Sequence, residues 1–439
     1  MKYLTYFFDR LMKRYLPDAF LFAVLLTFLV FLLGITLTPS GPLEMISFWG
    51  DGLWNLLKFS MEMTLILVTG HALANTAPIK FCLDKLASLA KDQAKAVLLT
   101  TLVSSLACWV NWGFGLIVSA LFALELAKRI KQLNFALILA SSYSGFLVWH
   151  SGLSGSIPLK LTSPSIDIQE IIGESSLALS ETVFSSFNLV LLLVNIFCIF
   201  GINFWLSQVE KKHSHDSDFD LAEAKPSSLT KADNSFAAQL ENSKLLVIVF
   251  CSFAFIYLIQ YFFAGKSLNL GTVSFVFLFL GYLFSQTTRN YLKLFKDAVT
   301  QSSGIILQFP LYAGLMAMMK SSGLSQMMTQ LFLDFSSADS FLFFTYLSAG
   351  LLNFFVPSGG GQWAIQAPII LPAAKELGVD FSKASMAIAW GDAWSNMIQP
   401  FWALPLLSLT GVKLQEMMSY TVIIFIGSGV VTGLFLLLN

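Results

Sequence analysis

Two polar segments lie within strongly apolar sequence and contain its best candidates for chemistry. One segment, SYSGFLVWHSGLSGSIP, contains His150, and the other, WGDAWSNMIQPFWALP, contains Asp392, Ser395 and Asn396. Asp392 and Asn396 are four residues apart, so on a helix they share a face. An ionisable side chain in a membrane interior costs about 3 kcal/mol and is rarely kept without a use. Asp392, His150 and Ser395 are therefore candidates for binding a coupling ion, although a buried structural hydrogen bond would also explain them.

Two glycine turns are the second candidate for a site. One turn is VNWGFG, which contains Asn111, and the other is VPSGGG, which contains Ser358. Irregular backbone at membrane depth is tolerated only where it lines a protein-enclosed or watery cavity. Helices that begin after such turns present unpaired N–H groups that attract a carboxylate, while carbonyls of the preceding arm could hold a cation. The predicted substrate-binding residues are Asn111, Trp112, Gly113, Ser358, Gly359, Gly360, Gly361, Gln362 and Asn396, with sodium near Asn111, Ser358 and Asn396.

The glycines have a second explanation, because small residues also let helices pack closely. Three consecutive glycines beside Pro357 favour a site, and Gly360 is expected to need a positive φ or a close backbone approach. Several tryptophans gather around the turns and polar segments, namely Trp112, Trp363, Trp390, Trp394 and Trp402. They indicate either an aromatic lining for a small organic solute or ordinary core packing.

The composition determines the class of protein that must position these residues. The 439 residues are 56% hydrophobic and only 12% charged, whereas a soluble domain has about 25% charged residues. Long apolar runs recur along the chain, which predicts an all-α polytopic membrane protein in contact with lipid. The net charge is zero, so no nucleic-acid partner is expected. No cofactor is expected apart from sodium as a coupling ion.

An internal repeat divides the chain. At a constant offset of 246 residues, WVNWGFG falls on FVPSGGG, and Gly145 falls on Gly391. Repeats of this kind are typical of transporters, whose substrate sites lie where the repeats meet. We expect a first transmembrane repeat over 1–207, a cytoplasmic polar linker over 208–243, a connecting helix over 244–267 and a second repeat over 268–439.

Lysine and arginine positions predict how the repeats cross the membrane. Basic clusters precede and follow the Asn111 turn, and each arm between them is about 15 residues, or roughly 22 Å of helix. This is shorter than the ~30 Å hydrocarbon core, so the segment is predicted to enter and return as a re-entrant hairpin. The basic N-terminus is expected in the cytoplasm. The connecting helix is an odd crossing, which inverts the second repeat. Each repeat then holds one re-entrant hairpin and one broken transmembrane helix.

The two motifs VPSGGGQWAIQAP and WGDAWSNMIQPFWALPLL resemble the short-chain fatty acid transporter family of bacteria, along nearly the whole chain. That family is similar to the wider ion-transporter superfamily of carboxylate symporters. The resemblance implies a multi-pass protein of the bacterial inner membrane that takes up small monocarboxylates such as acetoacetate or butyrate. It also implies hairpin tips at Ser358–Gln362 and Asn111–Gly115. The superfamily's Ser-Asn-Thr tip motif is absent, which leaves both sodium and protons as coupling ions.

Other function classes remain as alternatives. A channel or facilitator for small organic anions would show neither saturation nor counterflow. An intramembrane hydrolase would combine Ser358 or Ser154 with His150, but the repeat places Ser358 and His150 on different elements. No phosphate-binding Walker motif occurs, which argues against ATP-driven pumping. The sequence leaves the oligomeric state open, with a homodimer among the options.

Overall fold

The computed structural model describes residues 7–8, 10–12, 14, 17–130, 133–162, 176–210, 235–266 and 270–439. These ranges contain helices and connecting turns and no β-strand. The first half contains α2 (Ala19–Leu37), α3 (Pro42–Gly52), α4 (Leu57–Ala74), α5 (Ala77–Ala87), α6 (Gln93–Val110), α7 (Trp112–Arg129), α8 (Phe135–Ser144), the 3-10 helix η1 (Gly145–Ser151), α9 (Ser156–Leu161) and α11 (Ser186–Glu210).

Two helices connect the halves, α12 (Phe236–Glu241) and α13 (Lys244–Phe263). The second half contains α14 (Leu270–Ser285), α15 (Thr288–Val299), the 3-10 helix η2 (Thr300–Ser302), α16 (Ser303–Ser321), α17 (Leu324–Leu333), α18 (Phe341–Asn353), α19 (Gly359–Glu376), α20 (Phe381–Ser395), the 3-10 helix η3 (Asn396–Ile398), α21 (Pro400–Thr410) and α22 (Leu414–Leu437). Most of the predicted linker, residues 211–234, lies outside the described residues, and its described end contains the short helix α12.

Several helices have the length and composition of membrane spans. Within the described residues there are five, namely α2, α6, α11, α13 and α22. The bent pairs α3–α4 and α15–α16, with bends of 43° and 49°, raise the total to seven if each pair is one span. Helix α6 passes this test but ends at Asn111, which is only 2% exposed, and the chain returns as α7 packed against α6. These two helices therefore form a hairpin with a buried tip.

The order of elements repeats in the two halves. Each half has a bent helix pair, a short helix, a hairpin and an interrupted helix, and corresponding helices begin 246 residues apart: Pro42 and Thr288, Leu57 and Ser303, Phe135 and Phe381. The offset seen in the sequence is thus also an offset between structural elements. The opposite orientation of the halves across a membrane stays a prediction.

Both interrupted helices have local causes. Helix α20 gives way to η3 and an extended Gln399 because Pro400 has no N–H to donate and begins α21 instead. In the first half, Gly152 and Gly155 follow η1, and a Cβ on Gly152 would collide with the carbonyl oxygen of Trp109 at the tip of the first hairpin. The break therefore brings the backbone of one element directly against the tip of another.

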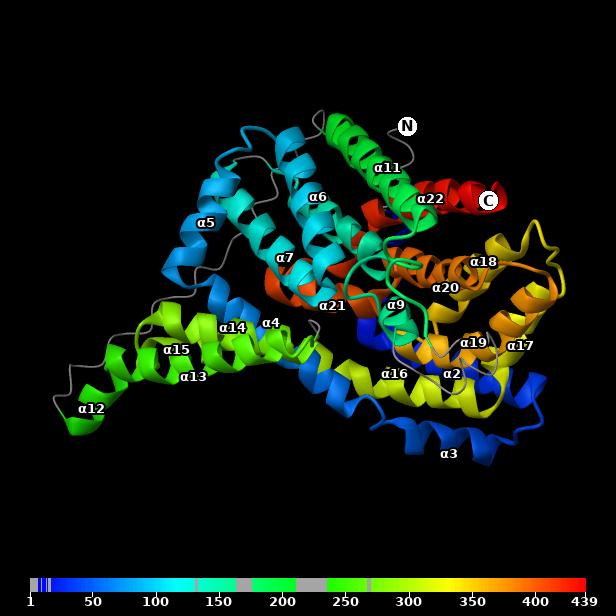
Figure 1. Cartoon of the computed structure of the whole chain (residues 1–439), viewed down its shortest axis with the longest axis horizontal. Coiled ribbons are helices and arrows are strands. Elements are labelled where there is room, and N and C mark those ends of the chain that lie inside the picture. Colours follow the sequence, from blue (N-terminus) through cyan, green and yellow to red (C-terminus); the bar gives the residue numbers. More distant parts are fainter. Residues whose placement is uncertain are drawn as a thin grey trace.

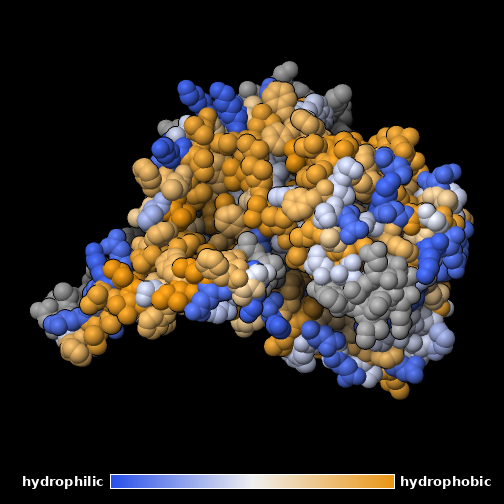
Figure 2. Space-filling view, viewed as in Figure 1, coloured by the Kyte–Doolittle hydropathy of each residue, from blue (hydrophilic) through white to orange (hydrophobic). Residues whose placement is uncertain are grey.

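The molecule has a compact body and a projecting arm. Helices α12 to α15 extend to one side in Figure 1, while the hairpins and interrupted helices pack together in the body. The arm is attached through α14 and α15, which pack on α4. Apolar side chains cover the centre and left of the face shown in Figure 2, while hydrophilic side chains gather on its right side.

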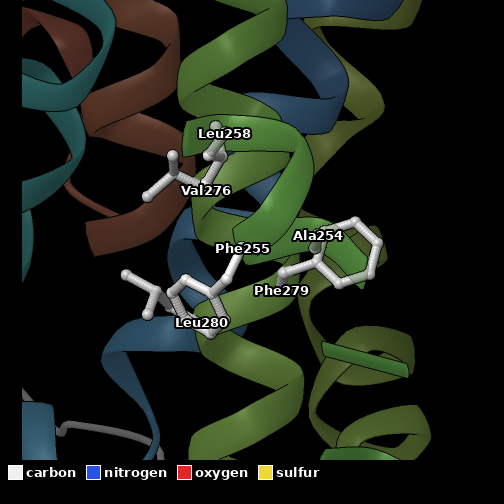
Figure 3. A pocket seen from close by; sticks show the side chains of 6 residues that line it. All are labelled: Ala254, Phe255, Leu258, Val276, Phe279 and Leu280. Atoms are coloured by element: carbon white, nitrogen blue, oxygen red, sulfur yellow. The ribbon is translucent and has the colours of Figure 1, made fainter. Parts of the chain in front are cut away.

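A small apolar pocket lies on the arm between α13 and α14. Its lining is entirely hydrocarbon: Ala254, Phe255, Leu258, Val276, Phe279 and Leu280 (Figure 3). These side chains offer no donor to a carboxylate, so the candidate site lies elsewhere.

Candidate functional site

The tip of the first hairpin is held by protein groups. The Asn111 side chain caps α7 by accepting from Phe114 N at 3.0 Å, and Trp112 N donates to Ser154 Oγ at 2.9 Å. The Trp109 carbonyl accepts from Leu153 N at 2.8 Å. Several N–H groups expected to be free for a carboxylate are therefore already bonded. Ser154 of the interrupted helix thus covers part of the tip, and carboxylate binding here stays a prediction.

Gly113 and Gly115 lie in the first turn of α7, and both are buried. A Cβ on Gly115 would collide with the backbone of Cys108 on α6. Close packing of the two hairpin arms therefore accounts for Gly115, as the alternative explanation expected.

The tip of the second hairpin is more open. Ser358 caps α19 by accepting from Gly361 N at 3.3 Å, and no described group accepts from the amides of Gly359 or Gly360. Within the described residues, positive φ among glycines occurs only at Gly265, Gly323, Gly378 and Gly411, so the tip glycines do not need it. The expectation of a positive φ at Gly360 is wrong.

Gly359 is the glycine with the closest neighbour at this tip. A Cβ there would lie 2.5 Å from His150 Cε1 and 3.0 Å from Nε2. A Cβ on Gly360 would lie 3.4 Å from Lys160 Cε, which is ordinary contact. The second tip thus touches the interrupted helix of the first half through Gly359 and His150.

His150 and Asp392 form a pair that joins the two interrupted helices. His150 Nδ1 lies 3.2 Å from Asp392 Oδ1, and both residues are 0% exposed. Asn396 Nδ2 donates to the same oxygen at 3.3 Å, which confirms that Asp392 and Asn396 share a face. The other oxygen, Asp392 Oδ2, is buried and has no partner in the described part of the chain. One carboxylate oxygen is thus fully engaged, while the other is available to a further donor or cation.

The hydrogen bonds of His150 define its tautomer. Ile157 N lies 3.1 Å from His150 Nε2. A backbone N–H can only donate, so Nε2 carries the lone pair and the ring proton is on Nδ1. His150 is therefore neutral in this conformation and donates to Asp392.

Asn353, at the end of α18, is a connecting residue that the sequence interpretation missed. Its amide nitrogen donates to the Asp392 carbonyl at 3.0 Å, to Ser395 Oγ at 2.9 Å and to Asn396 Oδ1. It thereby ties the second hairpin to the break in the second interrupted helix. An asparagine at a helix end resembles an ordinary cap in sequence, and only its position before the glycine turn could have suggested more.

Lys160 is a second residue that the sequence interpretation missed. Its Nζ donates to the Gly360 carbonyl at 2.9 Å, and no carboxylate within the described ranges pairs with it. This lysine of α9 in the first half therefore contacts the tip of the second hairpin directly.

Gln362 and two of the candidate tryptophans form hydrogen bonds within the protein. Gln362 Nε2 donates to the Ala349 carbonyl at 2.9 Å, which links the arms of the second hairpin. Trp390 Nε1 donates to Asn188 Oδ1 at 3.0 Å, and Trp394 Nε1 donates to the Phe425 carbonyl at 2.7 Å. Trp363 is 6% exposed within α19. The indole hydrogen bonds of Trp390 and Trp394 are structural, whereas the buried Gln362 Oε1 has no partner in the described residues. Trp112 and Trp402 lie together, with ring centroids 5.1 Å apart.

The structure therefore brings most of the predicted site into one region. Ser154 and Trp149 of the first interrupted helix contact the first hairpin tip, and His150 lies against the second. Asp392, Ser395 and Asn396 adjoin the second hairpin through Asn353. No three His, Cys, Asp or Glu side chains come together as metal ligands in the described ranges.

Comparison with known proteins decides the family. The sequence profile of the short chain fatty acid transporter family matches residues 1–438. The chain belongs to the short-chain fatty acid transporter family. A relative from Escherichia coli K12, provisionally named a short-chain fatty acid transporter, is 40% identical over 427 residues and 97% of each chain. A relative from Haemophilus influenzae with the same provisional name is 38% identical over 441 residues and 98% of each chain.

Two solved structures are similar to the transporter at low identity. The YdaH transporter of Alcanivorax borkumensis has a TM-score of 0.45 and 15% identity, with 95% of this chain and 98% of that chain covered. The MtrF protein of Neisseria gonorrhoeae, from a class of antimetabolite efflux pumps, has a TM-score of 0.40 and 14% identity, with 97% of each chain covered.

Family membership confirms several expectations. The protein is a multi-pass, all-helical membrane transporter of the short-chain fatty acid class, and its family consists of transporters rather than enzymes. The hydrolase alternative also finds no support in the geometry, because both ring nitrogens of His150 are engaged by Asp392 and Ile157 rather than by a serine.

Proposed function

We propose that this protein is a secondary active transporter that moves a small monocarboxylate, such as butyrate or acetoacetate, together with a proton across the bacterial inner membrane. The observation that carries this proposal is the buried pair of His150 and Asp392, because it joins the interrupted helices of the two halves. A group shared by both halves can make the movement of one half against the other depend on its protonation state.

The hydrogen bonds around Asp392 favour a proton over sodium. Oδ1 already accepts from His150 and Asn396, while Oδ2 has no partner among the described residues. A proton on Oδ2 would add a donor without breaking an existing hydrogen bond. Sodium coupling near Asn111, Ser358 and Asn396 is therefore the second candidate.

The position of the second tip supports coupling between substrate and proton. Gly359 touches His150, and the free amides of Gly359 and Gly360 belong to the N-terminus of the 18-residue helix α19. An anion that approaches this region would lie close to the proton site, and each would favour binding of the other by electrostatic attraction. Inverted orientation of the two repeats would allow this region to open alternately to each side.

The deciding experiment measures uptake of labelled butyrate by proteoliposomes, with pH and sodium gradients imposed separately and empty liposomes as background. We expect an inward proton gradient alone to drive accumulation. Asp392→Asn should abolish accumulation but spare exchange of labelled for unlabelled butyrate, which needs no net proton movement. The matched control is Asp51→Asn, an exposed carboxylate on α3, which should behave as wild type.

Two results would contradict proton coupling. Accumulation driven by sodium alone would favour the second candidate, and the Asp392→Asn protein would then need a higher sodium concentration for half-maximal uptake. Butyrate flux without saturation or counterflow would favour a channel.

A further inference from the structure

A cluster of three tryptophans lies beside the proton site and joins elements from both halves. We call Trp112 of α7, Trp149 of η1 and Trp402 of α21 the indole cluster. Their ring centroids are 5.1 Å apart for Trp112 and Trp402, 5.9 Å for Trp112 and Trp149, and 6.1 Å for Trp149 and Trp402. Trp112 is 5% exposed, Trp149 is 1% exposed and Trp402 is 2% exposed. Each indole thus contacts the other two inside the protein.

Several N–H donors in this region are buried without an acceptor. In the described part of the chain, Trp149 Nε1, Trp402 Nε1 and Asn111 Nδ2 have no hydrogen-bond partner. The fully buried Trp390 differs, because its indole N–H donates to Asn188. A buried donor without a partner costs about 1–3 kcal/mol, and about 90% or more of buried polar groups in proteins are bonded. Two of these donors belong to the cluster and the third to the residue before Trp112, so all three are candidates to donate to an acceptor that binds beside the cluster.

The chemistry of the donors restricts what that acceptor is. An indole N–H can donate but not accept, and the Asn111 oxygen is already used to cap α7. An ionised carboxylate has two oxygens that only accept. The N-terminus of the 18-residue helix α7 adds a favourable partial positive charge beside Asn111. The site thus suits a monovalent organic anion without a lysine or arginine.

The surroundings of the cluster suit a short alkyl chain. Phe146 stacks on Trp149 with centroids 5.5 Å apart, and it lies 5.6 Å from Trp402. Phe59 of α4 lies 6.2 Å from Trp402 and 6.4 Å from Trp112. Burying a methylene group against such rings contributes about 0.8 kcal/mol.

Resting on the transport function proposed above, we propose that the indole cluster, rather than the N-terminus of α19, is the site that holds the substrate. The N–H groups of Trp149, Trp402 and Asn111 hold the carboxylate, and the alkyl chain packs against Phe59 and Phe146. Since Trp149 is followed directly by His150, the bound carboxylate lies next to the proposed proton site. Neutral amides are excluded from this site, because their NH₂ group can only donate and would face the N–H groups of Trp149, Trp402 and Asn111, which also only donate.

The test is equilibrium binding of labelled butyrate to the purified full-length protein in detergent. Trp149→Phe and Trp402→Phe keep an aromatic ring but remove the N–H. Each should weaken binding about tenfold or more, the loss expected for one hydrogen bond to a charged group. Asn111→Asp keeps the oxygen that caps Phe114 N but replaces the donor with an acceptor, and it should bind no measurable butyrate.

The matched control is Trp49→Phe. Trp49 Nε1 is also without a partner in the described residues, but Trp49 lies on α3 against Gly314 and is partly exposed. This variant should bind butyrate with wild-type affinity. Excess unlabelled butyrate should displace the label from the wild-type protein, whereas butyramide should not.

The outcomes separate this inference from the proposed function. Wild-type affinity in Trp149→Phe and Trp402→Phe, or displacement by butyramide, would overturn the carboxylate assignment and leave proton-coupled transport standing. A wild-type protein that binds no butyrate would overturn both. Size-exclusion profiles identify variants that do not fold. If either tryptophan variant fails to fold, Asn111→Asp, which retains all three indoles, still tests the assignment.

Discussion

At the scale of single residues, the second hairpin tip gives the clearest contrast. Gly359→Ala should lower butyrate uptake at least tenfold at equal protein level, because the added Cβ would lie 2.5 Å from His150 Cε1 and must displace it from Asp392. Gly201→Ala on α11 is the control, since an added Cβ there would have nothing within 4 Å. Uptake in proteoliposomes measures both variants. Equal loss in both, or in neither, would contradict the role of the His150 contact.

Asn353 gives a prediction about stability. Asn353→Ala removes the donor to the Asp392 carbonyl, Ser395 and Asn396, and it should lower the free energy of unfolding by about 1–3 kcal/mol. Thermal unfolding of the purified protein is the measurement. Asn242→Ala, at the exposed end of α12, should change it by less than about 0.5 kcal/mol. Equal midpoints for the two variants would show that the Asn353 contacts contribute no net stability.

Individual residues of the site could be predicted from the sequence where their chemistry conflicts with their surroundings. His150 and Asp392 are visible because ionisable groups are rare in apolar segments. Their pairing is not visible, because they are 242 positions apart and the repeat register aligns His150 with Asn396 instead. Lys160 was missed because a lysine at a helix end resembles an interfacial residue. Trp149 was missed because a missing hydrogen-bond partner is a property of three-dimensional packing alone.

At the scale of elements, most helix positions could be predicted. The sequence predicts one hairpin and one broken helix in each repeat, and in the second half the structure has the hairpin α18–α19 and the interrupted helix α20–α21. Apolar runs, glycine turns and Pro400 fix such boundaries locally. The hydrogen bonds at the tips could not be predicted, because their partners come from other elements. The Trp112 amide, for example, donates to Ser154 of the interrupted helix.

The first hairpin gives a prediction about orientation. Lys131, from the predicted basic cluster, lies outside the described residues, so Lys91 and Lys128 at the outer ends of α6 and α7 are the useful positions. Single cysteines at both should react with a membrane-impermeant reagent from the cytoplasmic side, because the hairpin returns to the face from which it enters. Reaction from opposite sides would make α6 a complete span and contradict the inverted repeat.

At the scale of the whole molecule, the site belongs to neither half alone. Trp112 and Trp149 come from the first half and Trp402 from the second, and the pair of His150 and Asp392 is divided in the same way. Residues 1–210 and 235–439 expressed together as two chains should therefore restore butyrate uptake, while either chain alone should give none. Uptake by one chain alone would contradict a shared site. Coexpression of 1–210 with a second chain that contains Asp392→Asn is the control, and it should show exchange without accumulation.

The stacking of Trp149 on His150, with ring centroids 4.0 Å apart and planes 18° from parallel, has an optical consequence. A change in the charge or position of the imidazole alters the field at the indole face, to which an aromatic ring is sensitive. The emission of Trp149 should therefore report the state of the coupling pair in real time. The difference in fluorescence between the wild-type protein and Trp149→Phe isolates this signal from the other nine tryptophans. Trp149 is thus an intrinsic fluorescent probe that lies directly against His150 of the proposed coupling pair.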